Sequence, residues 1–275
     1  MTRTADEGLT TAVILARGLG SRMRAASGGV TLDAAQAAAA ASGAKAMMPL
    51  GGRPFLDYVL SALADAGVTD ACLVIGPEHG AVRDHYDARP AGRLRIGYAV
   101  QAEPRGTADA VAAAEAYVAG RRFIVVNGDN FYDPDAVARL ASVPGDATLG
   151  YDRAALVRLG NIPAERVAAF AILDADGGVL TGITEKPSVA QVAAAGEHAL
   201  VSMNCWAFTP AIFDACRAIG PSQRGEYEIA DAVLALVASG RPVRVVAVES
   251  GVLDLSSRAD VAAVEAALAG RAVAL

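Results

Sequence analysis

The first half of the chain alternates between two patterns of hydrophobic and polar positions. Short apolar runs rich in β-branched residues predict buried strands at residues 10–16, 71–75, 94–100 and 123–126. Between them, apolar residues at helical spacing predict helices at residues 54–66, 79–86, 107–118 and 134–141. Strands that alternate with such helices indicate βαβ units and a mostly parallel sheet, whose ligands gather beyond the carboxyl ends of the strands.

The pattern changes after Gly145. Two strands at residues 166–173 and 179–184 are expected to form a hairpin around the turn Asp176-Gly177-Gly178. Further strands are expected at 200–208, 243–248 and 252–253, and helices at 210–219, 227–239 and 257–269. With no Pro-, Gly- and Ser-rich linker and no internal repeat, residues 1–275 are expected to form a single α/β domain with a mixed sheet.

Residues 33–42 are almost pure alanine and lie between glycines. This stretch predicts a helix inserted, within residues 25–44, into the loop that follows the first strand. The insert separates that loop from the first of only two lysines in the chain, Lys45 and Lys186. Because all other basic side chains are arginines, the two lysines mark places where a compact ammonium group suits a phosphate oxygen.

Composition narrows the possible functions. An apolar fraction of 53% is ordinary for a globular protein, and a net charge of −6 argues against a general nucleic-acid binder. The N-terminus is polar and acidic, unlike a secretory signal, and no apolar run is long enough to span a bilayer. Three cysteines without metal-ligand spacing are expected to be reduced. These features predict a cytoplasmic protein with no nucleic-acid or membrane partner.

Several short motifs bear on phosphate chemistry. The loop Gly18-x-Gly20-x-Arg22 follows a strand, so its backbone N–H groups and its arginine suit a phosphate, although a structural turn fits as well. Asp129 follows an apolar strand and a glycine, where it is either a Mg²⁺ ligand or a turn residue. Asp254 is either a metal ligand or a helix cap, a task for which Ser256 and Ser257 are better placed.

Taken in order, these segments resemble the sugar-1-phosphate nucleotidyltransferases. The resemblance runs from residue 11 to about residue 264 and rests on residues 15–23 (LARGLGSRM), 45–56 (KAMMPLGGRPFL), 101–108 (QAEPRGTA), 125–129 (VVNGD) and 185–187 (EKP), followed by Asn204 and Asp254. Each motif alone is weakly specific, whereas the ordered set is specific. The resemblance implies a Rossmann-like, GT-A-like three-layer fold with a mixed, mostly parallel sheet and a sugar-binding part at about residues 145–230.

The resemblance also implies roles for individual residues. The catalytic residues would be Arg22, Lys45, Asp129 and Lys186, with Mg²⁺ held by Asp129 and Asp254. The nucleotide would be bound by Ala16, Gly18, Gly20, Arg22, Gln101, Gly106, Thr107 and Gly128. The sugar phosphate would be bound by Glu185, Lys186 and Asn204.

Three features depart from the family pattern. Arg17 stands where the loop usually has a small residue, so its charge lies beside the phosphates or points to solvent. The insert at residues 25–44 is longer than the usual link. Ala168, in the strand expected near Arg166, stands where the family often has a glycine against the sugar, and would narrow the pocket there. The chain shows no hexapeptide repeats, so no β-helix acyltransferase domain is expected.

The expected activity is a Mg²⁺-dependent transfer of a nucleotidyl group from an NTP to a sugar-1-phosphate, with release of pyrophosphate. The resemblance further suggests a homo-oligomer. Two alternatives remain open at this stage: a nucleotidyltransferase for a non-sugar phosphate, such as an alcohol phosphate or a cofactor precursor, and a non-catalytic sugar-nucleotide-binding protein. The sequence names neither the base nor the sugar.

Overall fold

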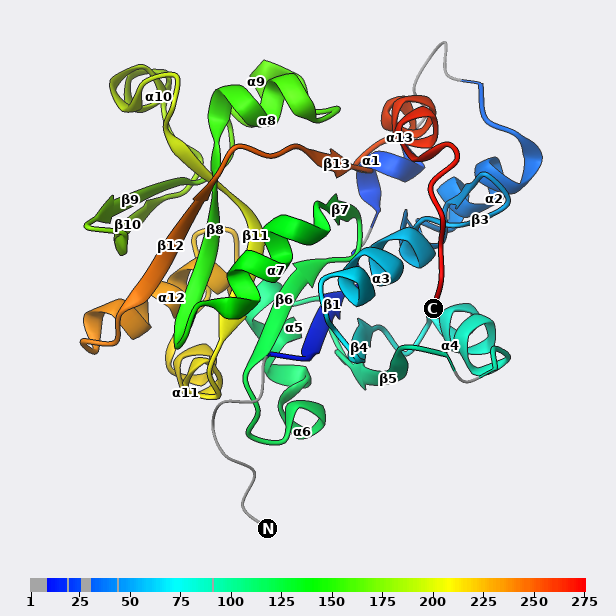
Figure 1. The fold of residues 1–275 in the computed structure, drawn as a ribbon, viewed down its shortest axis with the longest axis horizontal. Coiled ribbons are helices and arrows are strands. Elements are labelled where there is room, and N and C mark those ends of the chain that lie inside the picture. The colour runs from blue at the N-terminus through cyan, green and yellow to red at the C-terminus, as the bar shows by residue number, and fades with distance from the viewer. Residues whose placement is uncertain (1–8, 19, 26–30, 44, 91) are drawn as a thin grey trace.

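A computed structural model describes residues 9–18, 20–25, 31–43, 45–90 and 92–275. Within these ranges a nine-stranded sheet runs through the molecule in the order β5-β4-β1-β6-β11-β8-β12-β10-β9 (Figure 1). Its strands are β1 (Thr11–Leu15), β4 (Asp70–Ile75), β5 (Arg95–Val100), β6 (Phe123–Asn127), β8 (Asp146–Asp152), β9 (Ile172–Asp176), β10 (Val179–Thr184), β11 (Leu200–Phe208) and β12 (Val243–Val248). Two small sheets pair β2 (Pro49–Leu50) with β3 (Arg53–Pro54) and β7 (Asn130–Tyr132) with β13 (Val252–Asp254).

The sheet is mixed, as the sequence predicts. Strands β5, β4, β1 and β6 pair in parallel, as do β8 and β12, whereas β10 and β11 are antiparallel to their neighbours. Among the described strands of this sheet, seven of nine therefore run in one direction. The parallel half contains the predicted βαβ units, so the carboxyl ends of β1, β4 and β6 meet at one edge.

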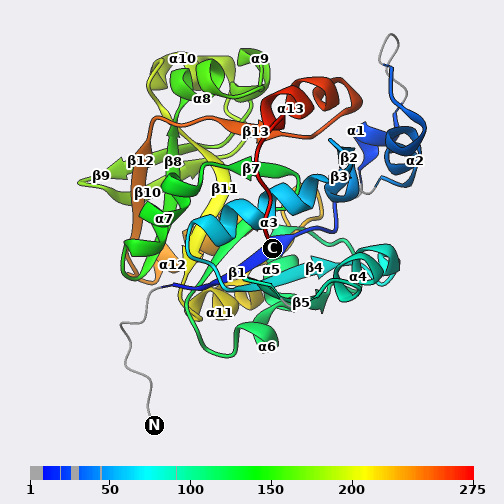
Figure 2. The same cartoon turned by 45° about the vertical axis from the view of Figure 1, so that its right-hand side comes forward.

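Helices cover both faces of the sheet, giving three layers (Figures 1 and 2). Successive residues of a strand point to opposite faces: Ala12 and Ile14 of β1 contribute to one hydrophobic core and Val13 to the other. The first core is covered by α2 (Ala34–Ser42), α3 (Phe55–Asp65), α4 (Gly80–Asp87), α7 (Pro134–Ser142), α8 (Arg153–Leu159) and α13 (Val261–Leu268). The second is covered by α5 (Thr107–Ala113), α6 (Glu115–Val118), α11 (Ala211–Ala218) and α12 (Ile229–Ala238).

The remaining short elements are α1 (Ser21–Arg24), α9 (Ala164–Val167), α10 (Val189–Ala195) and the 3-10 helices η1 (Lys45–Met47) and η2 (Arg258–Asp260). The helix predicted at residues 33–42 is confirmed as α2, which begins with a capping box between Asp33 and Gln36. Residues 26–30 and 44 of the predicted insert lie outside the described residues. Cys72 and Cys205 are buried free thiols in β4 and β11, as expected.

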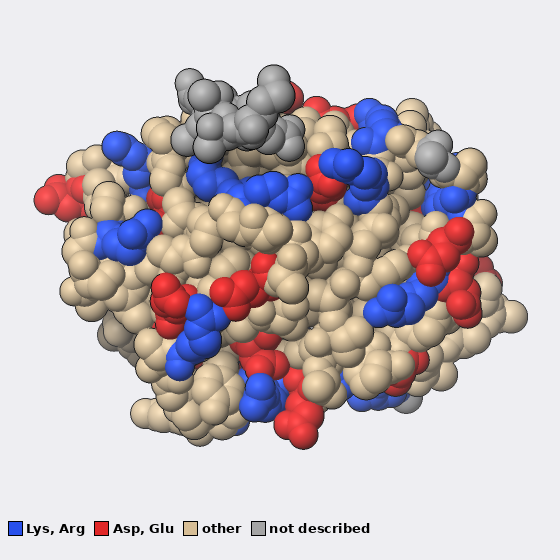
Figure 3. Space-filling view, turned by 90° about the horizontal axis from the view of Figure 1, so that it is seen from below, with Lys and Arg blue, Asp and Glu red and all other residues tan. Residues whose placement is uncertain are grey.

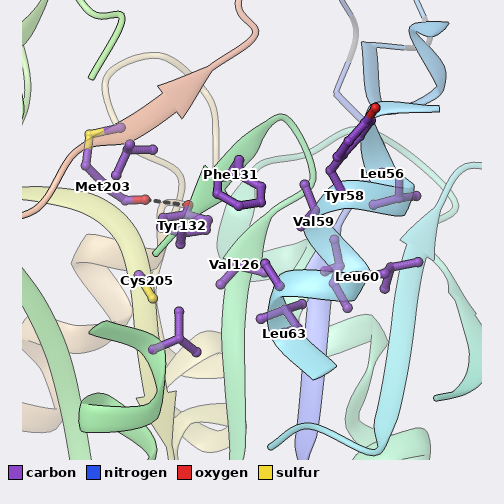
Figure 4. Packing of buried hydrophobic residues seen from close by; sticks show 14 of the residues in the cluster. Leu56, Tyr58, Val59, Leu60, Leu63, Val126, Phe131, Tyr132, Met203 and Cys205 are labelled. Carbon is purple, nitrogen blue, oxygen red and sulfur yellow. Dashed lines mark hydrogen bonds between the residues drawn. The ribbon is translucent and has the colours of Figure 1, made fainter. Parts of the chain in front are cut away.

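Packing around β7 fixes the position of the strand that follows β6. Phe131 and Tyr132 lie among the side chains of α3, Val126 and Cys205 (Figure 4). The buried hydroxyl of Tyr132 donates a hydrogen bond of 2.7 Å to the main-chain oxygen of Met203. This bond joins β7 to β11 across the core, and a buried hydroxyl needs such a partner.

The predicted hairpin is confirmed as β9 and β10, but its first strand begins later than predicted. Residues 166–173 were expected to be extended, but residues 164–167 form α9 and the strand β9 begins only at Ile172. Pro163 lies at the N-cap of α9 with Glu165 in its first turn, a sequence that suits a helix start. Ala168 therefore ends a helix and does not lie in a strand.

Strand β8 and helices α8 and α10 were not predicted. Gly150 lies inside β8, and a Cβ at this position would lie 2.8 Å from Cγ1 of Val245 in the neighbouring strand. A glycine that permits close strand packing thus resembles a turn signal in the sequence. The side-chain cap Asp152 of α8 and the capping box of Ser188 and Gln191 that starts α10 are short polar motifs that are easily assigned to loops.

The end of the molecule near α6 and α11 carries basic and acidic side chains interspersed with each other (Figure 3). Arg217 of α11, for example, pairs with Glu115 of α6 and with Asp214, both at 2.5 Å. Exposed pairs of this kind contribute little to stability. None of the helices in the described ranges combines the length and apolar composition that a bilayer span requires.

Candidate functional site

Two cavities adjoin at the edge of the sheet where β1 and β6 end. The first cavity has a volume of about 360 Å³ and is lined by Leu15, Arg17, Gly18, Gln101, Pro104, Gly106, Thr107, Ala110, Asn127, Asp129, Asn204 and Glu226. The second cavity has a volume of about 250 Å³ and is lined by Arg22, Lys45, Asn127, Asp129, Asn130, Arg166, Phe170, Ser202, Met203, Asn204, Asp254 and Ser256. Asn127, Asp129 and Asn204 belong to both linings, so the cavities meet at these residues.

Asp129 lies at this junction and pairs with Lys45. The distance from Nζ of Lys45 to Oδ2 of Asp129 is 2.6 Å, and both side chains are largely buried. Gly128 lets the turn before Asp129 approach β1, since its N–H donates to the oxygen of Leu15 at 2.9 Å and an added Cβ would lie 3.1 Å from that oxygen. Ala16, Gly18 and Gly128 line a small recess beside this ion pair.

Asp254 is the second carboxylate and is held more tightly. Oδ1 accepts from Nδ2 of Asn130 at 3.2 Å, and both oxygens lie 2.9 Å from the hydroxyl of Ser256. Arg166 contributes an ion pair at 3.3 Å. Burial and the nearby charge of Asp129 raise the pKa of Asp254 to about 6, against the opposing effect of Arg166.

The backbone of Asp254 is fixed as well. Asn161 donates to its oxygen at 2.9 Å and accepts from its N–H at 2.7 Å. Asp254 does not cap the following helix, because Ser257 forms a capping box there with Asp260. Ser256 instead binds Asp254, so only one of the two serines proposed as caps from the sequence has that role.

The glycine loop leads into α1. Gly20 has a φ of +59°, and a Cβ at this position would lie 2.3 Å from the main-chain oxygen of Gly43. The loop is thus packed against the end of α2, in a conformation that only glycine adopts without strain. Arg22 is exposed and reaches the second cavity from α1.

Gln101 lies at the end of β5 and is 4% exposed. Its Nε2 donates to the oxygen of Gly106 at 3.0 Å and to Oδ2 of Asp109 at 2.8 Å. Arg17 donates to the main-chain oxygen of Gln101 and pairs with Glu78 at 3.3 Å. Its side chain is only 8% exposed, so Arg17 does not point to solvent. Arg17 lines the first cavity and not the second, which is lined by Lys45.

Gly106 and Thr107 form the start of α5 beside the first cavity. A Cβ on Gly106 would lie 2.5 Å from the oxygen of Tyr227, so this position requires glycine. The hydroxyl of Thr107 accepts from the N–H of Ile229 at 2.8 Å and joins α5 to α12. Glu226 also lines this cavity.

Asn204 reaches both cavities because β11 is irregular. The register between β11 and β8 shifts between Ser202 and Trp206, and Asn204 has a φ of +54°. Its N–H donates to the hydroxyl of Ser202 at 3.2 Å, and its Oδ1 accepts from Trp206 at 3.4 Å. A positive φ at a non-glycine residue is uncommon and often accompanies a functional position.

Glu185 and Lys186 follow β10 and line neither of the two cavities. Surrounding protein atoms and the carboxylate of Glu228 raise the pKa of Glu185, against the opposing charge of Arg224. Lys186 has a φ of +45°. The structure thus places this pair beside the loop before α12, apart from the residues that gather around Asp129.

Sequence reasoning missed several residues of the second cavity. Arg166 pairs with Asp254 and, at 3.0 Å, with Asp260, and Phe170 lines the cavity where Ala168 was expected. The misassigned strand at residues 166–173 explains both omissions. Within the described ranges no group of three or more His, Cys, Asp or Glu residues is suited to hold a metal ion, which leaves Asp129 and Asp254 as a pair of carboxylates.

The chain belongs to the nucleotidyl transferase family, whose model matches residues 11–255. It is 30% identical to the UTP–glucose-1-phosphate uridylyltransferase AglF of Haloferax volcanii, covering 89% of this chain and 90% of that protein. It is 33% identical to the glucose-1-phosphate thymidylyltransferase of Streptomyces antibioticus over 90% of this chain and 63% of that protein.

Solved structures show the same fold. A UTP-bound UGPase from Acinetobacter baumannii matches with a TM-score of 0.74 and 17% identity, over 96% of this chain and 95% of that one. A UDP-glucose pyrophosphorylase complexed with UDP-glucose matches with a TM-score of 0.72 and 17% identity, over 94% of this chain and 98% of that one. The family model and the two relatives, rather than these structures, confirm the family expected from the ordered motifs.

Proposed function

We propose that this protein joins an NTP to a sugar-1-phosphate, giving an NDP-sugar and pyrophosphate. The observation that carries the proposal is the junction of the two cavities at Asp129 and Asn204. The first cavity is lined by Gln101, whose amide is expected to contact the nucleobase. The second cavity is lined by the cationic side chains of Arg22 and Lys45 and by the carboxylates of Asp129 and Asp254. A reaction between two phosphate-bearing substrates needs such a meeting point.

In this proposal the nucleotide occupies the first cavity and extends to the glycine loop. Gln101 and Gly106 contact the base, and Thr107 supports that wall through its bond to Ile229. Gly18 and Gly20 allow phosphates to approach the backbone, and Arg22 and Lys45 neutralise their charge. Ala16 and Gly128 close the recess behind Lys45.

The sugar phosphate enters on the side of Asn204. Glu185 and Lys186, at the end of β10, contact its hydroxyls and its phosphate once it is bound. Because they line neither cavity in this structure, their role depends on an acceptor that reaches beyond the cavities. An acceptor without sugar hydroxyls, such as an alcohol phosphate, is favoured by that same observation as a second candidate.

Two buried carboxylates suit Mg²⁺, which prefers oxygen ligands and takes one or two carboxylates from a protein. The raised pKa of Asp254 supports the fit of this pair of carboxylates to a cation. Burial and the nearby charge of Asp129 raise that pKa, so the protein's own cations do not fully compensate the charge of Asp254. Asp129 and Asp254 would hold the ion, and Lys45 and Arg166 now pair with them. When bound, Mg²⁺ would neutralise charge on the phosphates of the nucleotide.

The chain's own residues then position two anions for one displacement. An oxygen of the acceptor phosphate forms a bond to the α-phosphorus of the NTP, the bond from that phosphorus to the bridging oxygen breaks, and pyrophosphate leaves. The acceptor phosphate is already ionised, so no general base is required. Arg22 and Lys45 reduce the repulsion between the anions, and the cavities fix their approach.

Release of pyrophosphate tests the proposal. The protein is incubated with Mg²⁺ and each common NTP against a panel of sugar-1-phosphates and alcohol phosphates. Release that requires one NTP and one sugar-1-phosphate is expected. Release only with an alcohol phosphate would support the second candidate, and NTP binding without any turnover would indicate a non-catalytic nucleotide-binding protein.

The finer fold assignment is the Rossmann-like, GT-A-like arrangement, which the three layers and mixed sheet support. A homo-oligomer and a cytoplasmic location are expected from the family resemblance and the sequence. Light scattering of the purified protein measures its oligomeric state and so tests the expected homo-oligomer.

A further inference from the structure

Helix α1 carries Arg22 but is too short to hold itself in place. It has a single turn, closed by main-chain hydrogen bonds from Arg24 to Gly20 at 2.9 Å and from Ala25 to Ser21 at 3.0 Å. A helix of this length is unstable in water on its own, because its few hydrogen bonds do not offset the entropy lost in forming the first turn. Contacts from outside α1 must therefore fix its position.

The side chain of Arg22 does not provide such a contact. It is exposed, lines the second cavity, and forms no hydrogen bond or ion pair with any other residue in the described part of the chain. The position of its guanidinium group therefore depends on the backbone of α1. In the proposed function this group neutralises phosphates of the NTP, so the backbone of α1 determines where those phosphates are held.

An arginine from a distant part of the sequence holds the end of α1. Nε of Arg258 donates to the main-chain oxygen of Met23 at 2.8 Å, and its Nη2 donates to that of Arg24 at 3.4 Å. The last carbonyl groups of a helix have no partner within it, and an arginine side chain can supply one. The side chain of Met23 is fully buried in the first core and anchors the same turn. Helix α13, which follows Arg258, lies beside α1 in both views (Figures 1 and 2).

The segment that carries Arg258 is joined to both carboxylates of the second cavity. Arg258 begins η2, shortly after Asp254 at the end of β13. Asp260 holds η2 in place, because its Oδ2 accepts from the N–H groups of the two serines before Arg258 at 3.1 and 2.7 Å. Between them, the N–H of Leu255 donates to the main-chain oxygen of Asp129 at 2.9 Å. Arg258 thus connects a segment that is fixed to Asp129 and Asp254 with the helix that carries the phosphate-binding arginine.

From this geometry we infer that Arg258 is a positioning residue for the triphosphate, which acts through Arg22 by holding α1 against the segment that contains Asp254. The inference rests on the proposed function and deepens it. A triphosphate bound by Arg22 has to lie at a fixed distance from Asp129 and Asp254 for the displacement to occur. Small errors in the placement of such groups reduce binding and activity strongly.

Arg258→Ala should weaken NTP binding about tenfold, because α1 loses both bonds at its end and Arg22 loses its fixed position. The probe is whichever of ATP, CTP, GTP, UTP and dTTP the wild type binds most tightly, titrated calorimetrically with Mg²⁺ and without acceptor. In steady-state kinetics the KM for the acceptor should change by less than about twofold. Arg258→Lys keeps a donor for one of the two carbonyl groups and should restore part of the binding.

A double-mutant cycle separates positioning from a general loss of stability. Arg22→Ala removes the group through which Arg258 acts, so adding Arg258→Ala should weaken NTP binding by less than about twofold further. Two effects that multiply would show that Arg258 acts independently of Arg22, and would overturn the inference. Arg258→Lys takes the place of Arg258→Ala in the cycle if the alanine variant does not fold.

Arg139→Ala is the matched control. Arg139 is exposed and its Nη2 also donates to a main-chain oxygen, that of Ala247 at 3.2 Å, but it lines neither cavity. This variant should bind the NTP as the wild type does. Wild-type NTP binding by Arg258→Ala, or an acceptor KM that rises as much as the NTP dissociation constant, would overturn the inference alone. If the wild type binds no NTP, the proposed function fails and the inference fails with it.

Discussion

At the scale of single residues, the two carboxylates of the second cavity have different surroundings. Asp129 pairs with the compact ammonium of Lys45, whereas Asp254 is fixed by Asn130, Ser256 and Arg166. The burial of Asp254 raises its pKa to about 6, so it carries a charge that the protein alone stabilises poorly. We therefore expect the two positions to respond differently to substitution.

Asp129→Asn is expected to lower pyrophosphate release about 100-fold or more, because it removes a charge at the junction of the cavities and leaves Lys45 without its partner. The rate is measured with saturating substrates and Mg²⁺. Asp135→Asn, on the exposed side of α7, serves as the control. Near-normal turnover by Asp129→Asn would remove this residue from the metal site.

Asp254 predicts a pH dependence of stability in the absence of metal. Its pKa is about 6 in the folded protein and near 3.8 when unfolded, so its favourable contribution is complete below pH 3.8 and is lost as the pH rises through 6. Relative to Asp254→Asn, the wild type should lose about 3 kcal/mol of unfolding free energy over that range. Urea unfolding of both proteins in EDTA measures this difference, and a constant difference would contradict the assigned pKa.

Substitutions of Gly20 and Gly52 distinguish the effect of steric conflict from the effect of backbone strain. Both have positive φ, but a Cβ on Gly20 would lie 2.3 Å from the oxygen of Gly43, whereas one on Gly52 meets nothing within 4 Å. Gly20→Ala should therefore weaken NTP binding and destabilise the protein by more than the roughly 1 kcal/mol expected for Gly52→Ala. Calorimetry and thermal unfolding test the pair, and equal effects would show that loop packing is unimportant.

At the scale of elements, strand ends and their connections position the site. The turn after β6 carries Asp129, and β13 pairs with β7 so that Asp254 lies opposite Asn130. The sequence predicted β1, β4, β6 and β11 because their apolar runs are distinct. It did predict the β9–β10 hairpin, but it missed α8 and α9 because residues 166–171 were assigned to the first strand of that hairpin, and this assignment hid Arg166.

Asn161 connects the loop after α8 to β13 through its two bonds to the backbone of Asp254. Asn161→Ala leaves both backbone groups without partners and should cost about 1–3 kcal/mol of unfolding free energy. It should also raise the Mg²⁺ concentration needed for half-maximal activity. Urea unfolding and a Mg²⁺ titration measure these effects, and the absence of both would mean that β13 is positioned by other contacts.

The β9–β10 hairpin ends just before Glu185 and Lys186, which we propose contact the acceptor. If Lys186 contacts only the acceptor phosphate, as we propose, Lys186→Ala should raise the KM for the sugar phosphate about tenfold or more and leave the KM for the NTP nearly unchanged. Steady-state kinetics with each substrate varied in turn provide the measurement. An unchanged acceptor KM would place Lys186 outside the binding site.

At the scale of the whole molecule, residues from distant parts of the sequence meet around the two cavities. Gly18, Lys45, Gln101, Asp129, Asn204 and Asp254 were each singled out from short motifs, and the fold brings all six to the cavity linings. The partners that orient these residues were not predicted. The contact of Asp109 with Gln101, of Asn161 with Asp254 and of Arg17 with Glu78 depends on tertiary packing that has no local pattern in the sequence.

In the proposed reaction, one acceptor phosphate displaces pyrophosphate from one NTP at the junction of the cavities. The most direct measurement quantifies pyrophosphate and nucleotide sugar together in a single reaction with Mg²⁺ and the preferred substrate pair. We expect both products to form in equal amounts and only when both substrates are present. Pyrophosphate released without the acceptor, or an NTP consumed with no nucleotide sugar formed, would contradict it.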